Sequence, residues 1–229
     1  MKKAAAIEAL KFVKPGMNIG LGTGSTANYF IEALGAKVNE GLDVKGVATS
    51  KATEDLAREH GIPLVRLHDY PHLDLTVDGA DEFDSEFRLI KGGGGALLRE
   101  KIVASSSRFM VVVADESKQV KKLGKFPLPV EVLVFGSKAT VWKVERAFKI
   151  LKLDVAINVR KTKTGELFVT ENGNSGPGPQ LTKVGARLPR QAIARTLINP
   201  TPPMPTYSKL RQQDPKQFNQ LVEFLSSLK

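Results

Sequence analysis

The chain has 229 residues, 41% of them hydrophobic, which is enough for a real core in one large domain or two modest ones. It contains no cysteine, which excludes disulfides, thiol catalysis and cysteine-based zinc sites. It has no uninterrupted run of about 18 apolar residues, and charged residues break up the apolar ones near its start. We therefore expect a cytoplasmic protein with no membrane partner.

The basic residues are unevenly distributed along the chain. The formal net charge is +10, a balance that raises nucleic acid as a partner. Residues 175–229 supply +6 of this charge, whereas the 174 residues before them carry only +4. Because the excess lies away from the motifs described below, we expect no nucleic-acid partner.

Hydrophobic patterns in residues 1–126 alternate between strands and helices. Helical spacing predicts a helix over 2–13, a second one that ends at Gly35, and others over 51–60, with Ser50 as N-cap, and about 96–104. Apolar runs predict strands at 17–21, 44–49, 62–67, 73–77 and 109–114, the last of them covered on both faces. This alternation predicts an α/β fold with a doubly wound, mostly parallel, Rossmann-like sheet as the catalytic domain. In such sheets ligands bind at the carboxyl ends of the strands.

A second, smaller α+β domain is predicted for residues 127–174. Two prolines in the stretch from Phe126 to Pro129 mark the boundary. A helix over 138–150 follows, with Trp142 expected in the core, and then a hairpin of strands 155–159 and 167–170. Residues 175–229 are basic and proline-rich, and only 217–228 have a helical pattern, so their structure is left open.

The turn Gly22-Thr23-Gly24-Ser25-Thr26 lies between a predicted strand and a predicted helix. Glycines allow close backbone approach, and the free N–H groups at a helix start attract anions, so the turn suits a phosphate group. The same glycine spacing also occurs in dinucleotide sites, but the next strand ends in Thr49-Ser50, where such a site has an acid. A tight turn with an N-cap is the structural alternative.

An acidic turn, Asp78-Gly79-Ala80-Asp81, follows the strand at 73–77. Its two carboxylates could bind and exchange protons with sugar hydroxyls, or ligate Mg²⁺, or form a solvated turn. Since no histidine lies nearby in the sequence, a transition metal is disfavoured.

Lys91 precedes four glycines, Gly92 to Gly95, and Glu100 follows in the next helix. A lysine at the mouth of a loop rich in N–H donors can stabilise an oxyanion. A carboxylate near a helix start is electrostatically favoured and, if buried, can act as a general base. The alternative for Glu100 is a solvated charged face shared with its neighbours Arg99 and Lys101.

These motifs, in this order, resemble the A-type ribose-5-phosphate isomerase family. The resemblance is carried by GLGTGSTANYFIEALG at 20–35, VATSKATEDLAREHGIPL at 47–64, DLTVDGADEFDSEFRLIKGGGGALLREKI at 74–102, VVADESKQVKKLGKFPLPVEV at 112–132 and TENGN at 170–174. After TENGN the chain departs from the family pattern, and 175–229 is either a divergent tail or a region read in a shifted frame. The substrate-binding positions that the resemblance implies are Thr23, Gly24, Ser25, Thr26, Asp78, Gly79, Ala80, Asp81, Lys91, Gly92, Gly93, Gly94 and Lys118.

The resemblance also implies an activity. It implies interconversion of D-ribose 5-phosphate and D-ribulose 5-phosphate through an enediolate, in the non-oxidative pentose phosphate pathway. Glu100 would transfer the proton, Asp78 and Asp81 would handle the sugar, Lys91 would steady the oxyanion and Lys2 would reach the phosphate. No cofactor or metal is implied, and a homodimer or homotetramer is expected. The alternatives are a sugar-phosphate-binding sensor domain without turnover and, from the charge of the tail alone, a nucleic-acid-binding protein.

Overall fold

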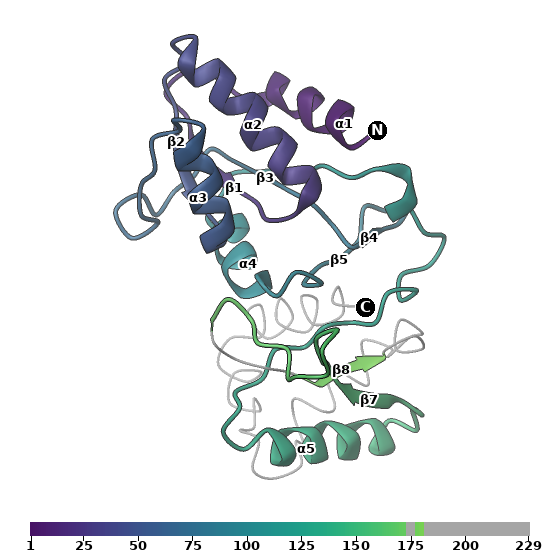
Figure 1. Ribbon diagram of the computed structural model, residues 1–229. Helices are drawn as coiled ribbons and strands as arrows, with labels where there is room; N and C mark the ends of the chain where they lie inside the picture. The colour runs from purple at the N-terminus through teal and green to yellow at the C-terminus, as the bar shows by residue number, and fades with distance from the viewer. Residues whose placement is uncertain (173–176, 181–229) are drawn as a thin grey trace, which may run out of the picture. The chain divides into compact units, whose positions relative to one another are not determined.

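The computed structural model describes residues 1–172 and 177–180, and the structural statements below concern these residues (Figure 1). The chain divides into two units, Met1–Thr182 and Lys183–Lys229, the second of which lies outside the described residues. The predicted helix at 217–228 is therefore not described. In the described part no helix is long and apolar enough to cross a membrane.

A four-stranded parallel sheet forms the centre of the first unit. Its strands are β1 (Asn18–Leu21), β2 (Lys45–Ala48), β3 (Leu75–Asp78) and β6 (Met110–Val112), in the order β2-β1-β3-β6. Gly20 of β1 pairs with Val47 on one side and Thr76 on the other. The strand order reverses at β1, so β1 and β3 flank a topological switch point, where open α/β sheets bind ligands.

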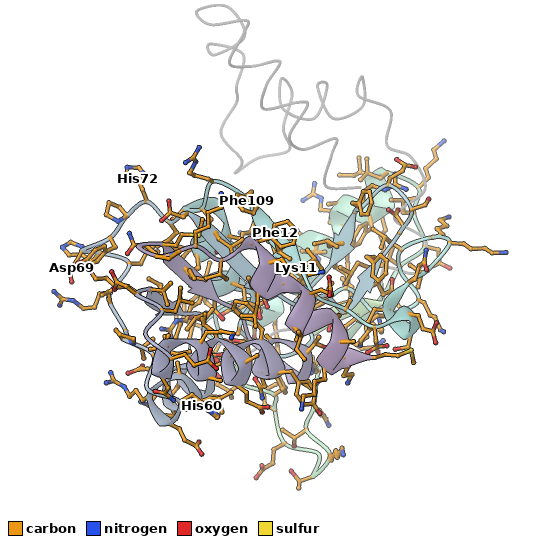
Figure 2. The ribbon with its side chains drawn as sticks, turned by 90° about the horizontal axis from the view of Figure 1, so that it is seen from above. Lys11, Phe12, His60, Asp69, His72 and Phe109 are labelled. Atoms are coloured by element: carbon orange, nitrogen blue, oxygen red, sulfur yellow. The ribbon has the colours of Figure 1, made fainter. Side chains whose placement is uncertain are left out.

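Helices cover both faces of this sheet, which confirms the doubly wound fold. The helices are α1 (Lys2–Ala9), continued by η1 (Leu10–Phe12), α2 (Ser25–Asn39), α3 (Lys51–Glu59) and α4 (Leu97–Ser105). Ile19 and Leu21 face the core with Phe30 of α2. Gly20 faces the opposite side, where an added Cβ would lie 2.5 Å from Val103 of α4. The ring of Phe12 in η1 lies edge-on to Phe109, with ring centroids 6.4 Å apart (Figure 2).

In this part the structure differs from the sequence prediction in several details. The stretch 62–67 forms only a single bridge, Gly46 with Leu64, because Pro63 has no N–H to continue a ladder. The residues at 109–114 are not covered on both faces, since Phe109 is 44% and Val112 is 36% exposed. Between β3 and α4 lies an antiparallel ribbon, β4 (Glu82–Phe83) with β5 (Leu89–Ile90), and its first strand was not predicted.

Gly35 does not end its helix, contrary to the sequence prediction. Helix α2 continues to Asn39, and the left-handed residue that follows it is Gly41, with φ 101°. An added Cβ at Gly35 would lie 2.5 Å from Cβ of His60. The glycine therefore permits close approach between α2 and the end of α3, instead of a cap.

The later part of the unit contains α5 (Ser137–Ile150) and a strand pair, β7 (Ala156–Val159) with β8 (Pro177–Gln180). The helix confirms the prediction for 138–150, but Trp142 is 56% exposed and is not a core residue. The predicted hairpin closes through a single bridge between Lys161 and Leu167, and β7 pairs along its length with β8 instead.

Candidate active site

The turns that follow β1 and β3 meet at the switch point, next to the loop that precedes α4. They form one pocket, which contains every substrate-binding position predicted from the sequence except Asp78 and Gly93. The lining residues are Thr23, Gly24, Ser25, Thr26, Ala27, Gly79, Ala80, Asp81, Lys91, Gly92, Gly94, Glu100, Val113 and Lys118. The strand-end prediction therefore identified residues that lie together in space.

Asp78 lies fully buried at the end of β3 and holds the two turns together. Its Oδ1 accepts hydrogen bonds from the backbone N–H of Thr23, at 3.1 Å, and of Gly79, at 2.7 Å. A Cβ on Gly22 would lie 2.2 Å from the same oxygen, so only glycine fits there. Burial raises the pKa of Asp78, while Lys91 and these hydrogen bonds oppose the rise.

The hydroxyl of Thr23 points into a buried polar cluster that the sequence did not reveal. Its Oγ1 lies 2.7 Å from that of Thr49 and 3.2 Å from that of Thr53. Thr49 donates its own hydrogen to the carbonyl of Leu21, and Thr53 donates to that of Gly22. The hydroxyl of Thr23 therefore donates to one of these two threonines, and the cluster holds the turn after β1 in place.

Lys91 places its ammonium group between the two buried acids. Its Nζ lies 3.0 Å from Oδ2 of Asp78 and 3.2 Å from Oε2 of Glu100, and it donates a hydrogen bond to the carbonyl of Gly79 at 2.5 Å. The two carboxylate contacts are ion pairs without directed hydrogen bonds, so within the described residues both oxygens lack a hydrogen-bond partner. Burial opposes the charge on Lys91, but Asp78 and Glu100 outweigh it and raise the pKa of the amine.

Glu100 sits in the first turn of α4 and is only 5% exposed. Burial, together with the negative charges of Asp78 and Asp81, raises its pKa to about 7 against the opposing effect of Lys91. A carboxylate with a pKa near neutral pH is suited to accept a proton and return it. The alternative of a solvated charged face is thus excluded for Glu100.

Asp81 holds the glycine loop and does not share a metal position with Asp78. Its Oδ2 accepts a hydrogen bond of 2.7 Å from the N–H of Gly93, whereas Oδ2 of Asp78 faces Lys91. A Cβ on Gly93 would lie 2.5 Å from Asp81, and Gly92 has a φ of 107°, so both positions require glycine. Within the described residues no group of three potential ligands could hold a metal ion.

Cationic side chains surround the start of α2, at the other end of the pocket. Lys2 donates from Nζ to Oγ of Ser25 at 3.0 Å. Lys118 lines the pocket at the end of a short 3₁₀ helix, Glu116–Lys118, which is capped by Asp115. Hydrogen bonding from Ser117 lowers the pKa of Asp115, and Lys2 and Lys118 lower it further. Amines, hydroxyls and a helix N-terminus together form a site for an anion such as a phosphate group.

Residues 45–175 match the family model described as ribose 5-phosphate isomerase A (phosphoriboisomerase A). The chain belongs to the ribose 5-phosphate isomerase A family. It is 58% identical over 173 residues to ribose-5-phosphate isomerase A of Parvibaculum lavamentivorans, which covers 76% of this chain and 75% of that one. With the Nitrobacter hamburgensis enzyme it shares 50% identity over 202 residues, or 88% of this chain and 85% of that one.

Solved structures of the family share the fold as well. Ribose 5-phosphate isomerase A from Methanocaldococcus jannaschii aligns with a TM-score of 0.69 at 43% identity, over 80% of each chain. A D-ribose-5-phosphate isomerase in complex with phospho-erythronic acid aligns with a TM-score of 0.71 at 38% identity, over 86% of this chain and 83% of that one. These matches confirm the family resemblance and the α/β fold predicted from the sequence.

Proposed function

We propose that this protein interconverts D-ribose 5-phosphate and D-ribulose 5-phosphate through an enediolate. The observation that carries the proposal is the buried Glu100 carboxylate, with a pKa of about 7, beside the ammonium group of Lys91. A reversible proton transfer between adjacent carbons needs one base that is also a competent acid, and a pKa near neutral pH provides both.

The site residues have separate roles in the proposed reaction. Glu100 takes the proton from C2 of the open-chain aldose, and the electron pair of the C–H bond forms the C1–C2 double bond. The negative charge then lies on O1, where Lys91 and the N–H donors of the glycine loop stabilise it. The hydroxyl proton moves from O2 to O1, and protonated Glu100 delivers its proton to C1, which leaves a ketone at C2.

The remaining positions hold the substrate. Asp78 and Asp81 bind the sugar hydroxyls and assist ring opening, and the turn Thr23 to Thr26 receives the phosphate together with Lys2 and Lys118. The contact between Lys2 and Ser25 and the helix start beneath them support this orientation. The enzyme works without cofactor or metal as a homodimer or homotetramer in the cytoplasm, which a native mass measurement and cell fractionation test.

The test is an isomerase assay with Glu100→Gln and the matched variant Glu145→Gln, a change at an exposed carboxylate on α5. We expect Glu100→Gln to lower kcat by about 10²–10⁴-fold, since it removes the base, and to leave affinity for phospho-erythronic acid within a few-fold. Glu145→Gln should match the wild type, and chelation with EDTA should change nothing. Near wild-type turnover by Glu100→Gln would refute the proposal, and a wild type that binds without turnover would favour the sensor alternative.

A further inference from the structure

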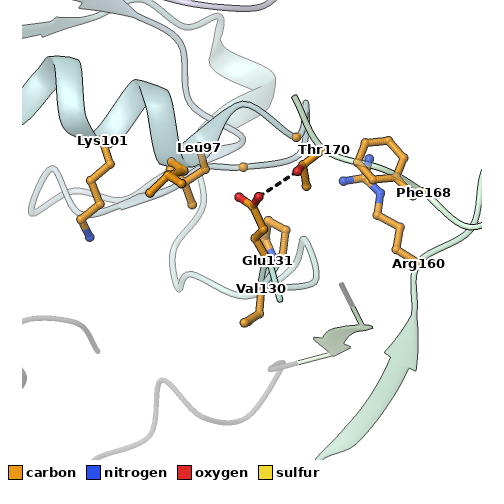
Figure 3. A pocket seen from close by; sticks show the side chains of 11 residues that line it. Leu97, Lys101, Val130, Glu131, Arg160, Phe168 and Thr170 are labelled. Carbon is orange, nitrogen blue, oxygen red and sulfur yellow. Dashed lines mark hydrogen bonds between the residues drawn. The ribbon is translucent and has the colours of Figure 1, made fainter. Parts of the chain in front are cut away.

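The glycine loop has an outer face, away from the substrate pocket, that packs against later parts of the same compact unit. A Cβ on Gly92 would lie 2.9 Å from Pro129, and one on Gly95 would lie 2.9 Å from the ring of Phe168. A second, largely apolar pocket lies here, between the start of α4 and the segments around Glu131 and Arg160 (Figure 3). The outer face therefore has close contacts at Gly92 and Gly95 beside an apolar pocket, and these contacts can control the loop.

Arg160 makes a polar contact between this outer face and the middle of the glycine loop. Its Nη2 donates a hydrogen bond of 2.6 Å to the carbonyl of Gly93. Its guanidinium lies over the ring of Phe168, with Cζ 3.7 Å from the ring centroid, as Figure 3 also shows. Stacking on an aromatic ring holds the guanidinium plane in one orientation, so the donor is fixed before it meets the carbonyl.

Gly93 is consequently held from two sides. Asp81 accepts from its N–H at 2.7 Å on the side of the substrate pocket, and Arg160 donates to its carbonyl on the other side. Further along, the N–H of Glu171 donates to the carbonyl of Gly95 at 3.1 Å, while the Glu171 carboxylate accepts from the N–H of Lys51 at 3.3 Å. The loop is therefore tied to both the sheet domain and the later segment.

The direction of one peptide group links Arg160 to the chemistry. In a trans peptide the C=O of one residue and the N–H of the next point in opposite directions. When Arg160 draws the Gly93 carbonyl outward, the N–H of Gly94 points inward, and Gly94 lines the substrate pocket. Within the described residues this N–H donates to no protein acceptor.

We propose that Arg160 is a positioning residue, which holds the Gly93–Gly94 peptide so that the Gly94 N–H is aimed at the oxyanion formed beside Lys91. This inference rests on the proposed isomerase function. Glycines have more backbone freedom than other residues, so a glycine loop without a fixed carbonyl would populate orientations in which that N–H turns away. An N–H group that is already oriented toward the oxyanion before the negative charge develops stabilises that charge without a rearrangement of the loop.

The test compares Arg160→Met and Arg160→Lys with the matched control Arg146→Met. Arg146 also stacks on an aromatic ring, with Cζ 5.5 Å from the centroid of Trp142, but it lies on α5 and, within the described residues, makes no hydrogen bond to the glycine loop. Methionine keeps the apolar stem over Phe168 and removes the donor, while lysine keeps one donor. The measurements are kcat, KM, the melting temperature, and inhibition by phospho-erythronic acid and by inorganic phosphate.

We expect Arg160→Met to lower kcat by about 10–100-fold, with KM and inhibition by phosphate within about three-fold of wild type. Affinity for phospho-erythronic acid, whose carboxylate carries charge where the enediolate does, should fall about ten-fold. Arg160→Lys should recover part of kcat, and Arg146→Met should leave all constants unchanged.

Two results would overturn the inference. One is an unchanged kcat in Arg160→Met. The other is an equal loss of phosphate and phospho-erythronic acid binding in both Arg160 variants with a lowered melting temperature, which would make Arg160 a purely structural contact. If the wild type shows no isomerase activity, the proposed function fails, and the affinities for phosphate and phospho-erythronic acid, measured by direct binding, still test Arg160 by themselves.

Discussion

The chemistry proposed for this protein depends on how one carboxylate is surrounded. Glu100 is almost fully buried, which disfavours its charge, and Asp78 and Asp81 disfavour it further. Lys91, 3.2 Å from the carboxylate, limits the rise in pKa. Without the lysine a buried carboxylate would stay protonated at neutral pH, and without burial it would be too weak a base.

This balance predicts the pH dependence of catalysis. Glu100 must be ionised to accept a proton, and its pKa is about 7. We therefore expect kcat/KM to rise with pH and to level off above about pH 7. A glutamate with the ordinary pKa near 4.5 would give a profile that levels off above about pH 4.5. The profile should be measured with substrate far below KM, and the titration of the substrate phosphate, with a pKa near 6, should be determined separately. An acidic limb near pH 4.5 would contradict the environment described for Glu100.

At the residue scale, the sequence was most informative where side chains stand at the ends of elements. Asp78 was selected after a strand, Lys91 before the glycine loop and Glu100 near the start of a helix, and in the structure Lys91 contacts both acids. Thr53 and Arg160 were not selected, because a threonine in a helix and an arginine in a hairpin have no distinctive local pattern. Their contacts with the turn after β1 and with the glycine loop exist only after distant segments have packed.

At the scale of elements, periodicity identified the parallel strands and the helices between them, but not the details set by packing. The prediction that α2 ends at Gly35 followed the usual preference of glycine for helix ends. In the structure, packing against the neighbouring α3 explains the glycine, because His60 occupies the space that a side chain at position 35 would need. In the same way the apolar stretch 62–67 reads as a strand, although Pro63 limits it to one bridge with β2.

Gly35→Ala tests this reading of α2. Helix propensity alone favours alanine by about 1 kcal/mol. We expect the opposite result, a loss of about 1–3 kcal/mol in the free energy of unfolding, because the new methyl group would lie 2.6 Å from the carbonyl oxygen of His60. Denaturant unfolding measures the difference, and Ala36→Gly, at an exposed position on the same helix, calibrates propensity. A more stable Gly35→Ala variant would show that α2 and α3 do not approach as closely as described.

At the scale of the molecule, the proposed catalytic groups and the residues that support them come from different parts of the chain. The pocket residues lie between Thr23 and Lys118, but the outer face of the glycine loop is held by residues from Pro129 to Glu171. The later segment is therefore part of the active-site architecture without lining the substrate pocket. The sequence predicted a boundary near Phe126 from its prolines, and it could not indicate this contact across the predicted boundary.

The charge of the whole chain should influence how substrate reaches the pocket. The net charge is positive for the whole chain, at +10, and for residues 1–174, at +4, so it should attract a sugar phosphate, and Lys91 and Lys118 line the pocket that receives it. Between about 10 mM and about 150 mM salt the Debye length shortens from about 30 Å to about 8 Å. We expect kcat/KM to fall several-fold over this range, because distant charges no longer contribute to capture of the anion.

The rate constant kcat should respond differently from kcat/KM. Once substrate is bound, the charges that act on it are those of Glu100, which is buried, and of Lys91, whose side chain is only 14% exposed. The two groups lie 3.2 Å apart, and salt screens such a pair weakly. kcat at saturating substrate should therefore stay constant, while sucrose at matched viscosity controls for slower diffusion. A parallel fall in kcat and kcat/KM would mean that salt perturbs the site itself, and a flat kcat/KM would mean that capture depends only on groups inside the pocket.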